Sequence, residues 1–245
     1  MSDDRNKKLP NKSSTADINS FLAKVRSTPA SRSTGKMGRL VFAMDATASR
    51  EPTWDYASQL QGQMFKETAN LGGLEIQLCY YRGFSEFYAS PWLDNTDQLL
   101  RQMTAVHCAA GHTQINRILK HCVNEAKAAT KSGTKSGDAK ISALVFIGDC
   151  VEEDIDKLGH SAGELGLLGI PAFMFQEGHD PIAAKAFQHI AHLSGGAYCP
   201  FNAGSAKQLR DLLSAVAVYV AGGHKALDNF HKRHGSVILK LGKPM

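Results

Sequence analysis

The chain has 245 residues, of which 43% are hydrophobic and 21% are charged, with a formal net charge of +5 at pH 7. This length suits one α/β domain with extensions, and the composition is ordinary for a globular protein. The longest apolar run near the end, 212–222, falls short of the roughly 20 residues that a membrane helix needs. We therefore expect a globular protein with no membrane partner.

The positive charge lies at the two ends of the chain. Residues 1–36 hold eight Lys/Arg against three Asp, and residues 224–245 hold five Lys/Arg against one Asp. These ends have few aromatic residues among the basic ones, so nucleic acid is not an expected partner. The charge pattern favours three parts: a flexible basic segment over 1–36 with a short amphipathic helix, a domain over 37–223, and a basic extension over 224–245.

The cysteines and the N-terminus indicate the compartment. The five cysteines are odd in number and form no Cys-x-x-Cys pair, which favours reduced thiols over a disulfide framework. The first residues are polar and lack the apolar segment of a secretory signal. We therefore expect a cytoplasmic protein.

Helical and strand patterns then alternate along the chain. An amphipathic helix over 16–25 would dock its apolar face on the domain or on a partner. The uninterrupted apolar run 40–44 is typical of a strand buried on both faces of a parallel sheet. Further expected strands cover 74–81, 84–88, 141–149, 170–175, a segment after Gly195-Gly196, and 236–241. Further expected helices cover 53–70, 95–106, 111–130, 152–168, 181–193 and 205–220.

Asp45, Thr47 and Ser49 follow the first strand at alternate positions. A parallel strand ends at the carboxyl edge of its sheet, where open α/β folds place their ligands. One carboxylate and two hydroxyls at this edge could turn toward one point, and such hard oxygens suit Mg²⁺ or Mn²⁺. Alone the triplet is a weak signal, because these residues are also common in turns and helix caps.

Asp45-x-Thr47-x-Ser49 resembles the Asp-x-Ser-x-Ser signature of von Willebrand factor A domains, whose metal-ion-dependent adhesion site binds a divalent cation. The loop Gly111-His112-Thr113 and the strand that ends at Asp149 resemble the other two parts of that site. The resemblance covers about residues 39–222. It implies a doubly wound, Rossmann-like α/β fold with six mostly parallel strands, one antiparallel edge strand, and helices on both faces.

The resemblance also implies a set of metal ligands. In the family the hydroxyls bind the cation directly, and the aspartates act partly through water. The expected ligands are Asp45, Thr47, Ser49, Thr113 and Asp149. Three residues depart from the family pattern: Thr47 replaces a serine, and His112 and Cys150 stand where glycines are common. The added bulk leaves the ligand chemistry possible but could narrow the site.

The function that the resemblance implies is that of a non-enzymatic binding module. The cation would keep an open position for an Asp or Glu side chain of a partner protein. Similar intracellular domains of prokaryotes work beside AAA-type ATPases, chaperones or assembly machinery, which is an analogy at family level. Two alternatives stay open: a metal-assisted hydrolase or phosphotransferase that uses Asp45 and Asp149, and a structural scaffold with a degenerate metal site.

Other motifs give weaker signals. Cys150 could act as a nucleophile, but a thiol that follows an apolar strand in the sequence is more often packed against other side chains and unreactive. No phosphate-binding glycine motif is complete. The pairs that invite a zinc interpretation match no known zinc spacing: His107-Cys108, His121-Cys122 and His189-x-x-His192.

Overall fold

A six-stranded sheet forms the centre of the molecule, in the order β3-β2-β1-β4-β5-β6. The computed structural model describes residues 15–29, 37–50, 73–131, 140–201 and 206–240. The strands are β1 (Gly38–Asp45), β2 (Leu74–Arg82), β3 (Glu86–Ala89), β4 (Ala143–Gly148), β5 (Ala172–Glu177) and β6 (Ala197–Phe201). Strand β3 is antiparallel to β2, and every other neighbouring pair is parallel. The expected α/β sheet with one antiparallel edge strand is confirmed.

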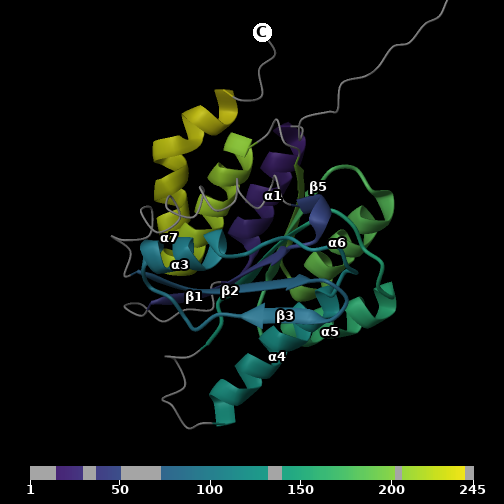
Figure 1. The fold of residues 1–245 in the computed structure, drawn as a ribbon. Helices are drawn as coiled ribbons and strands as arrows, with labels where there is room; N and C mark the ends of the chain where they lie inside the picture. Colours follow the sequence, from purple (N-terminus) through teal and green to yellow (C-terminus); the bar gives the residue numbers. More distant parts are fainter. Residues whose placement is uncertain (1–14, 30–36, 51–72, 132–139, 202–205, 241–245) are drawn as a thin grey trace, which may run out of the picture.

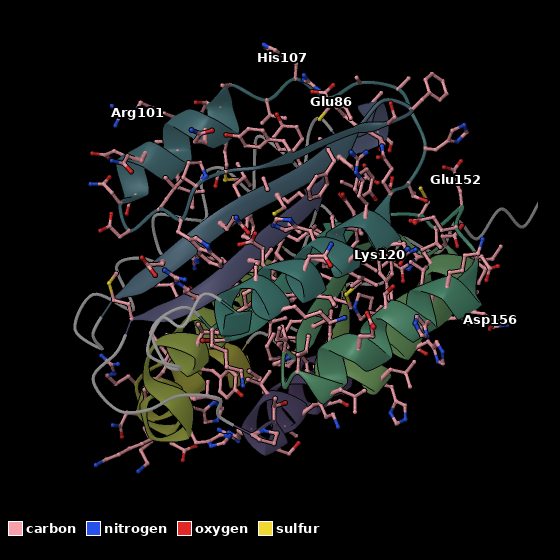
Figure 2. The ribbon with its side chains drawn as sticks, turned by 90° about the horizontal axis from the view of Figure 1, so that it is seen from below. Glu86, Arg101, His107, Lys120, Glu152 and Asp156 are labelled. Atoms are coloured by element: carbon pink, nitrogen blue, oxygen red, sulfur yellow. The ribbon has the colours of Figure 1, made fainter. Side chains whose placement is uncertain are left out.

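Helices cover both faces of the sheet (Figure 1). One face carries α1 (Thr15–Ser27), α3 (Thr96–Thr104) and α7 (Ala206–Lys240). The other face carries α4 (Ile115–Lys131), α5 (Ile155–Leu167) and α6 (Pro181–Ser194). Each helical layer packs on one face of the sheet and buries one apolar core. Strands β1 and β4 need cover on both faces, because their apolar residues are uninterrupted. Figure 2 looks onto the second layer, with Lys120 of α4 and Asp156 of α5 labelled.

Within the described ranges, every helix is too short or too polar to span a bilayer.

The amphipathic helix near the N-terminus packs on the domain. Its apolar residues Ile18, Phe21, Leu22 and Val25 are buried in the same core as α7. The Phe21 ring lies 5.9 Å from the Phe173 ring and 5.2 Å from the Phe175 ring, both on β5. Helix α1 is therefore predicted correctly, and the apolar face docks on the sheet. The division of the chain at residues 36 and 223 stays a prediction.

The expected strand over 236–241 is wrong, because helix α7 continues to Lys240 after a break at Gly223 (φ 66°, ψ −162°). The β-branched pair Val237-Ile238 favours a strand locally. A strand needs a hydrogen-bonded neighbour, however, whereas a helix satisfies its backbone groups within its own segment. The other helices and strands expected in the described ranges are present, with ends shifted by a few residues. The expected helix over 53–70 and most of the polar tail and linker segments lie outside the described residues.

Removing the Phe21 ring tests whether α1 is part of the folded core. We expect Phe21→Ala to lower the free energy of unfolding by about 3–5 kcal/mol, because the side chain is only 1% exposed and packs against two rings. Urea denaturation followed by far-UV circular dichroism measures the change. Lys24→Ala, on the exposed side of the same helix, is the control and should change little. Equal stability of Phe21→Ala and wild type would show that α1 does not support the fold.

Candidate metal centre

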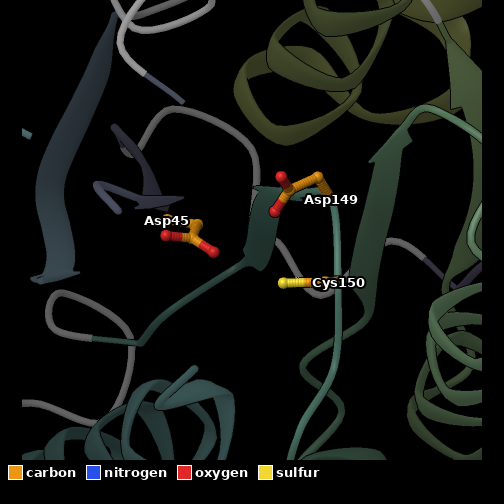
Figure 3. A group of neighbouring side chains, drawn as sticks. All are labelled: Asp45, Asp149 and Cys150. Atoms are coloured by element: carbon orange, nitrogen blue, oxygen red, sulfur yellow. The ribbon is translucent and has the colours of Figure 1, made fainter. Parts of the chain in front are cut away.

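The two aspartates that the sequence singles out lie side by side in the fold. Strands β1 and β4 are hydrogen-bonded neighbours, with Met44 paired to Ile147. Asp45 is the last residue of β1 and Asp149 follows β4. Figure 3 shows their side chains, with that of Cys150, extending into one space at the sheet edge. One ligand atom from each of the three lies within 4.8 Å of the other two.

Asp45 is completely buried, and two donors hold its carboxylate. The backbone N–H of Thr47 donates to Oδ1 at 2.7 Å, and the hydroxyl of Tyr81 donates to Oδ2 at 3.1 Å. Burial, reinforced by the neighbouring Asp45 carboxylate, raises the pKa of Tyr81 well above its usual value. Tyr81 therefore keeps its proton at neutral pH and stays a hydrogen-bond donor to the aspartate.

A chain of oxygens joins the loop after β1 to the end of β4. The hydroxyl oxygens of Thr47 and Ser49 are 3.3 Å apart, and the Ser49 hydroxyl donates to Asp149 Oδ2 at 2.9 Å. The other carboxylate oxygen, Asp149 Oδ1, is buried and has no hydrogen-bond partner in the described part of the chain. A buried carboxylate oxygen without a partner is costly. A hard cation would satisfy it, and the surrounding carboxylates and hydroxyls are ligands that Mg²⁺ accepts.

Thr113 lies in the loop before α4, and its hydrogen bonds go to Glu152. Its backbone N–H donates to Glu152 Oε2 at 3.0 Å, and its Oγ1 accepts from the Glu152 backbone N–H at 3.0 Å. These two bonds fasten the loop before α4 to the loop after Asp149. The structure thus brings together four of the five expected ligands and places Thr113 beside them with its hydroxyl engaged. Its role as a direct ligand stays a prediction.

Two residues that the sequence analysis did not single out support the site. Tyr81 is the register partner of Asp45 in the β1–β2 pair, so an aligned strand pattern could have indicated it. The Glu153 carboxylate accepts hydrogen bonds from the backbone N–H groups of Ile115 and Asn116 and thereby caps α4 from a distant loop. Burial raises the pKa of Glu153, partly offset by these donors. No local motif indicates this contact, because cap and helix are far apart in sequence.

The turn between β2 and β3 packs against the loop before α4. A Cβ on Gly111 would lie 1.9 Å from the carbonyl oxygen of Gly83, so only glycine allows the two backbones to approach. The backbone N–H of His112 donates to the same carbonyl at 3.2 Å. Beside it, the ring of Phe84 is 77% exposed and lies 5.2 Å from the His112 ring. An exposed aromatic pair therefore lies on the two loops that meet beside Glu152, next to the candidate centre.

The geometry does not favour nucleophilic or zinc chemistry. Burial and the charges of Asp149 and Asp45 raise the pKa of Cys150 to about 12, so the thiol is protonated at neutral pH. Among the described residues, the His-Cys pairs and the His189-His192 pair gather no third metal-ligating side chain. His121 instead shares a hydrogen bond of 2.9 Å with the Gln77 side chain.

No family model and no curated protein matches the chain. Solved structures do match it. A von Willebrand factor type A structure from Catenulispora acidiphila is 14% identical with a TM-score of 0.54, over 75% of this chain and 43% of that one. The fold is that of a von Willebrand factor A domain. The resemblance seen in the sequence is confirmed at the level of the fold.

Two further von Willebrand factor A-like structures are matched over nearly their whole length. The SpRpn10 VWA domain is 13% identical with a TM-score of 0.52, over 71% of this chain and 94% of that one. An aerotolerance-related membrane protein from Bacteroides fragilis is 14% identical with a TM-score of 0.52, over 72% of this chain and 98% of that one. At these identities the likeness concerns the fold.

Removing the Tyr81 hydroxyl tests its support of the buried carboxylate. We expect Tyr81→Phe to lower the free energy of unfolding by about 1–3 kcal/mol without added metal, because the fully buried Asp45 carboxylate loses a hydrogen-bond donor. Tyr88→Phe removes the same atom from a partly exposed bond to Gln102 and is the matched control. Chemical denaturation measures both. If Tyr81→Phe costs no more than the control, the Tyr81 hydroxyl does not stabilise Asp45.

Proposed function

We propose that the protein is a non-enzymatic binding module that uses a Mg²⁺-dependent (or Mn²⁺-dependent) adhesion site to recognise an Asp or Glu side chain of a partner protein. The observation that carries the proposal is the Asp149 carboxylate, whose Oδ1 is buried and unpartnered in the described part of the chain and which has an oxygen within 4.8 Å of one from the buried Asp45 carboxylate. Two carboxylates so close repel each other unless a cation or a proton lies between them. The hydroxyls of Thr47 and Ser49 complete an oxygen-rich set on the same side.

The proposed ligands are Asp45, Thr47, Ser49 and Asp149, with Thr113 joining from the adjacent loop. A divalent cation held there would supply positive charge that a partner carboxylate can neutralise. The residues around it fix the ligands in advance: Tyr81 and the Thr47 backbone orient Asp45, and the Ser49 hydroxyl orients Asp149. The methyl group of Thr47 keeps its hydroxyl in few rotamers, which suits a fixed ligand.

The surroundings of the site would decide which partner binds. The exposed Phe84 ring and His112 lie next to the candidate centre and offer apolar contact beside the carboxylate position. Aromatic anchors of this kind often dominate the binding energy of an interface. We place the protein in the cytoplasm, in keeping with five free thiols, and its partner in an ATPase- or chaperone-linked assembly by analogy with similar domains. An enzymatic role has less support, because no histidine joins the cluster in the described residues.

Added Mg²⁺ should stabilise the fold through this site. We expect Mg²⁺ at about one hundred times its Kd to raise the free energy of unfolding by about 2.7 kcal/mol. Thermal or urea denaturation in Mg²⁺ and in EDTA measures the difference. Asp45→Asn and Asp149→Asn should abolish the response, and Asp149→Asn should be at least as stable as wild type in EDTA because one repelling charge is gone.

Asp94→Asn is the control for the loss of one negative charge. Asp94 is exposed and follows β3, which runs antiparallel, so it lies at the opposite edge of the sheet. This variant should keep the full Mg²⁺ response. A response of the same size in Asp45→Asn would contradict the proposed site, and no response in wild type would favour the scaffold with a degenerate centre.

Partner capture tests the adhesion function itself. We expect a protein from the source cells to bind wild type in Mg²⁺ and to be lost both in EDTA and with Asp45→Asn, since each change removes the charge that the partner carboxylate needs. Affinity capture followed by mass spectrometry, with Asp94→Asn in parallel, identifies the partner. Capture of the same proteins under all conditions would show that the metal centre is not the binding determinant.

A further inference from the structure

A groove of about 520 Å³ runs along α4 beside the candidate metal centre. It extends from the loop before the helix to the middle of the helix, against the edge strand β3. The residues that matter for its chemistry are Phe87, Thr113, Gln114, Arg117, Lys120 and Glu153. Its size is within the range of grooves that bind short segments or small ligands. Lys120 lies on the face of α4 seen in Figure 2.

The groove carries two cations and one carboxylate that is already engaged. Arg117 is held in place by its Nη1, which donates to the Ser85 carbonyl at 2.6 Å and to the Gln114 side chain at 3.1 Å, and its guanidinium lies 5.3 Å from the Phe87 ring centre. An arginine has five N–H donors, so further ones can face a ligand. Lys120 is exposed and forms no ion pair with any described residue.

The acidic group in the groove offsets only part of this positive charge. The Glu153 carboxylate accepts from two backbone N–H groups at the start of α4, where the helix dipole also favours negative charge. Burial lowers the pKa of His121, which is hydrogen-bonded to Gln77, so this ring adds no positive charge at neutral pH. The lining of the groove therefore carries two positive charges, those of Arg117 and Lys120, against one negative charge, that of Glu153.

The groove is continuous with the proposed adhesion site. Thr113 lines it and is hydrogen-bonded to Glu152, three residues after Asp149. Lys120 stands about five residues into α4, which places it roughly 7–8 Å along the helix from its start. An extended chain covers that distance in about two to three residues. A segment that leaves the metal centre must first pass the loop before α4, which adds about one or two residues, so it would bring a side chain to Lys120 about three to five residues later.

We propose that the groove binds a second acidic side chain of the same partner segment, through Lys120 and Arg117. The occupant is an extended acidic peptide with one Asp or Glu at the metal centre and another about three to five residues away. This inference rests on the proposed adhesion function and adds to it the spacing of the recognised acids. Charge-assisted hydrogen bonds to a guanidinium and an ammonium give the groove its preference for a carboxylate.

Random peptides displayed on phage test the proposal, selected on the full-length protein in Mg²⁺. Wild type should enrich peptides with two acidic residues at one spacing. A selected peptide is then synthesised with a fluorophore, with and without its second acid changed to the amide, and its Kd is measured by fluorescence anisotropy. Lys120→Gln should weaken the two-acid peptide about two- to fivefold and leave the one-acid peptide unchanged, since only the former contacts the exposed ammonium.

Lys140→Gln is the matched control, because Lys140 is exposed and precedes β4 at the opposite edge of the sheet. It should bind both peptides as wild type does. A double-mutant cycle between Lys120 and the second acid isolates their coupling. Equal effects of Lys120→Gln on both peptides, or selection of peptides with a single acid, would overturn the groove as a site for an acidic side chain.

The same experiment separates this inference from the adhesion function. If Asp45→Ala and EDTA abolish binding while Lys120→Gln leaves the two-acid preference intact, the metal site stands and the groove proposal is wrong. If Asp45→Ala and EDTA have no effect while Lys120 still couples to an acid, the groove binds acidic peptides and the metal-dependent function fails. If no peptide is enriched on wild type, both proposals are overturned.

Discussion

The rest of the site depends on the satisfaction of one buried carboxylate. Asp45 ends a strand that is buried on both faces, where an ionised group without partners is too costly to keep. One of its partners, Tyr81, faces it only because the two residues are paired in the β1–β2 register. A slip of one residue would turn the Tyr81 side chain to the other face of the sheet. The charge at the sheet edge and the alignment of the central strands therefore depend on each other.

The loops around this carboxylate are tied to one another by backbone contacts. The Ala46 backbone donates to Tyr81 and accepts from Ala109, which joins the segment before α4 to the ends of β1 and β2. The close approach of Gly111 to Gly83 and the paired bonds between Thr113 and Glu152 continue this joining around the edge. Because these contacts already hold the loops in place, the loops would lose less conformational freedom when a partner binds.

The sequence predicted the strands that hold the two aspartates because each strand is recognised from a local pattern. An apolar run that ends at Asp45, and a second that ends at Asp149, are enough to place two acids at one edge once the strands are parallel neighbours. The roles of Tyr81 and Glu153 were missed. The hydrogen bond of Tyr81 to Asp45 depends on strand register, and the contact of Glu153 with α4 joins segments that are distant in sequence. The C-terminal strand was wrong for the opposite reason: local β-propensity in residues 236–240 suggested a strand, but the segment continues a helix.

Under the proposed function, the charges around the site would make recognition of an acidic partner conditional on the cation. The Asp45 and Asp149 carboxylates lie within 4.8 Å of each other, and Glu152 lies on the adjoining loop. Without a cation, the candidate centre is therefore negatively charged and repels an acidic segment. The ammonium of Lys120 is exposed and works in water, where a single ion pair contributes about 1 kcal/mol or less. A divalent cation would cancel the two aspartates and remove this repulsion, and only then could the weak attraction along α4 add to binding. The metal would thus determine whether an acidic partner binds at all, whereas the groove would determine which acidic sequence binds best.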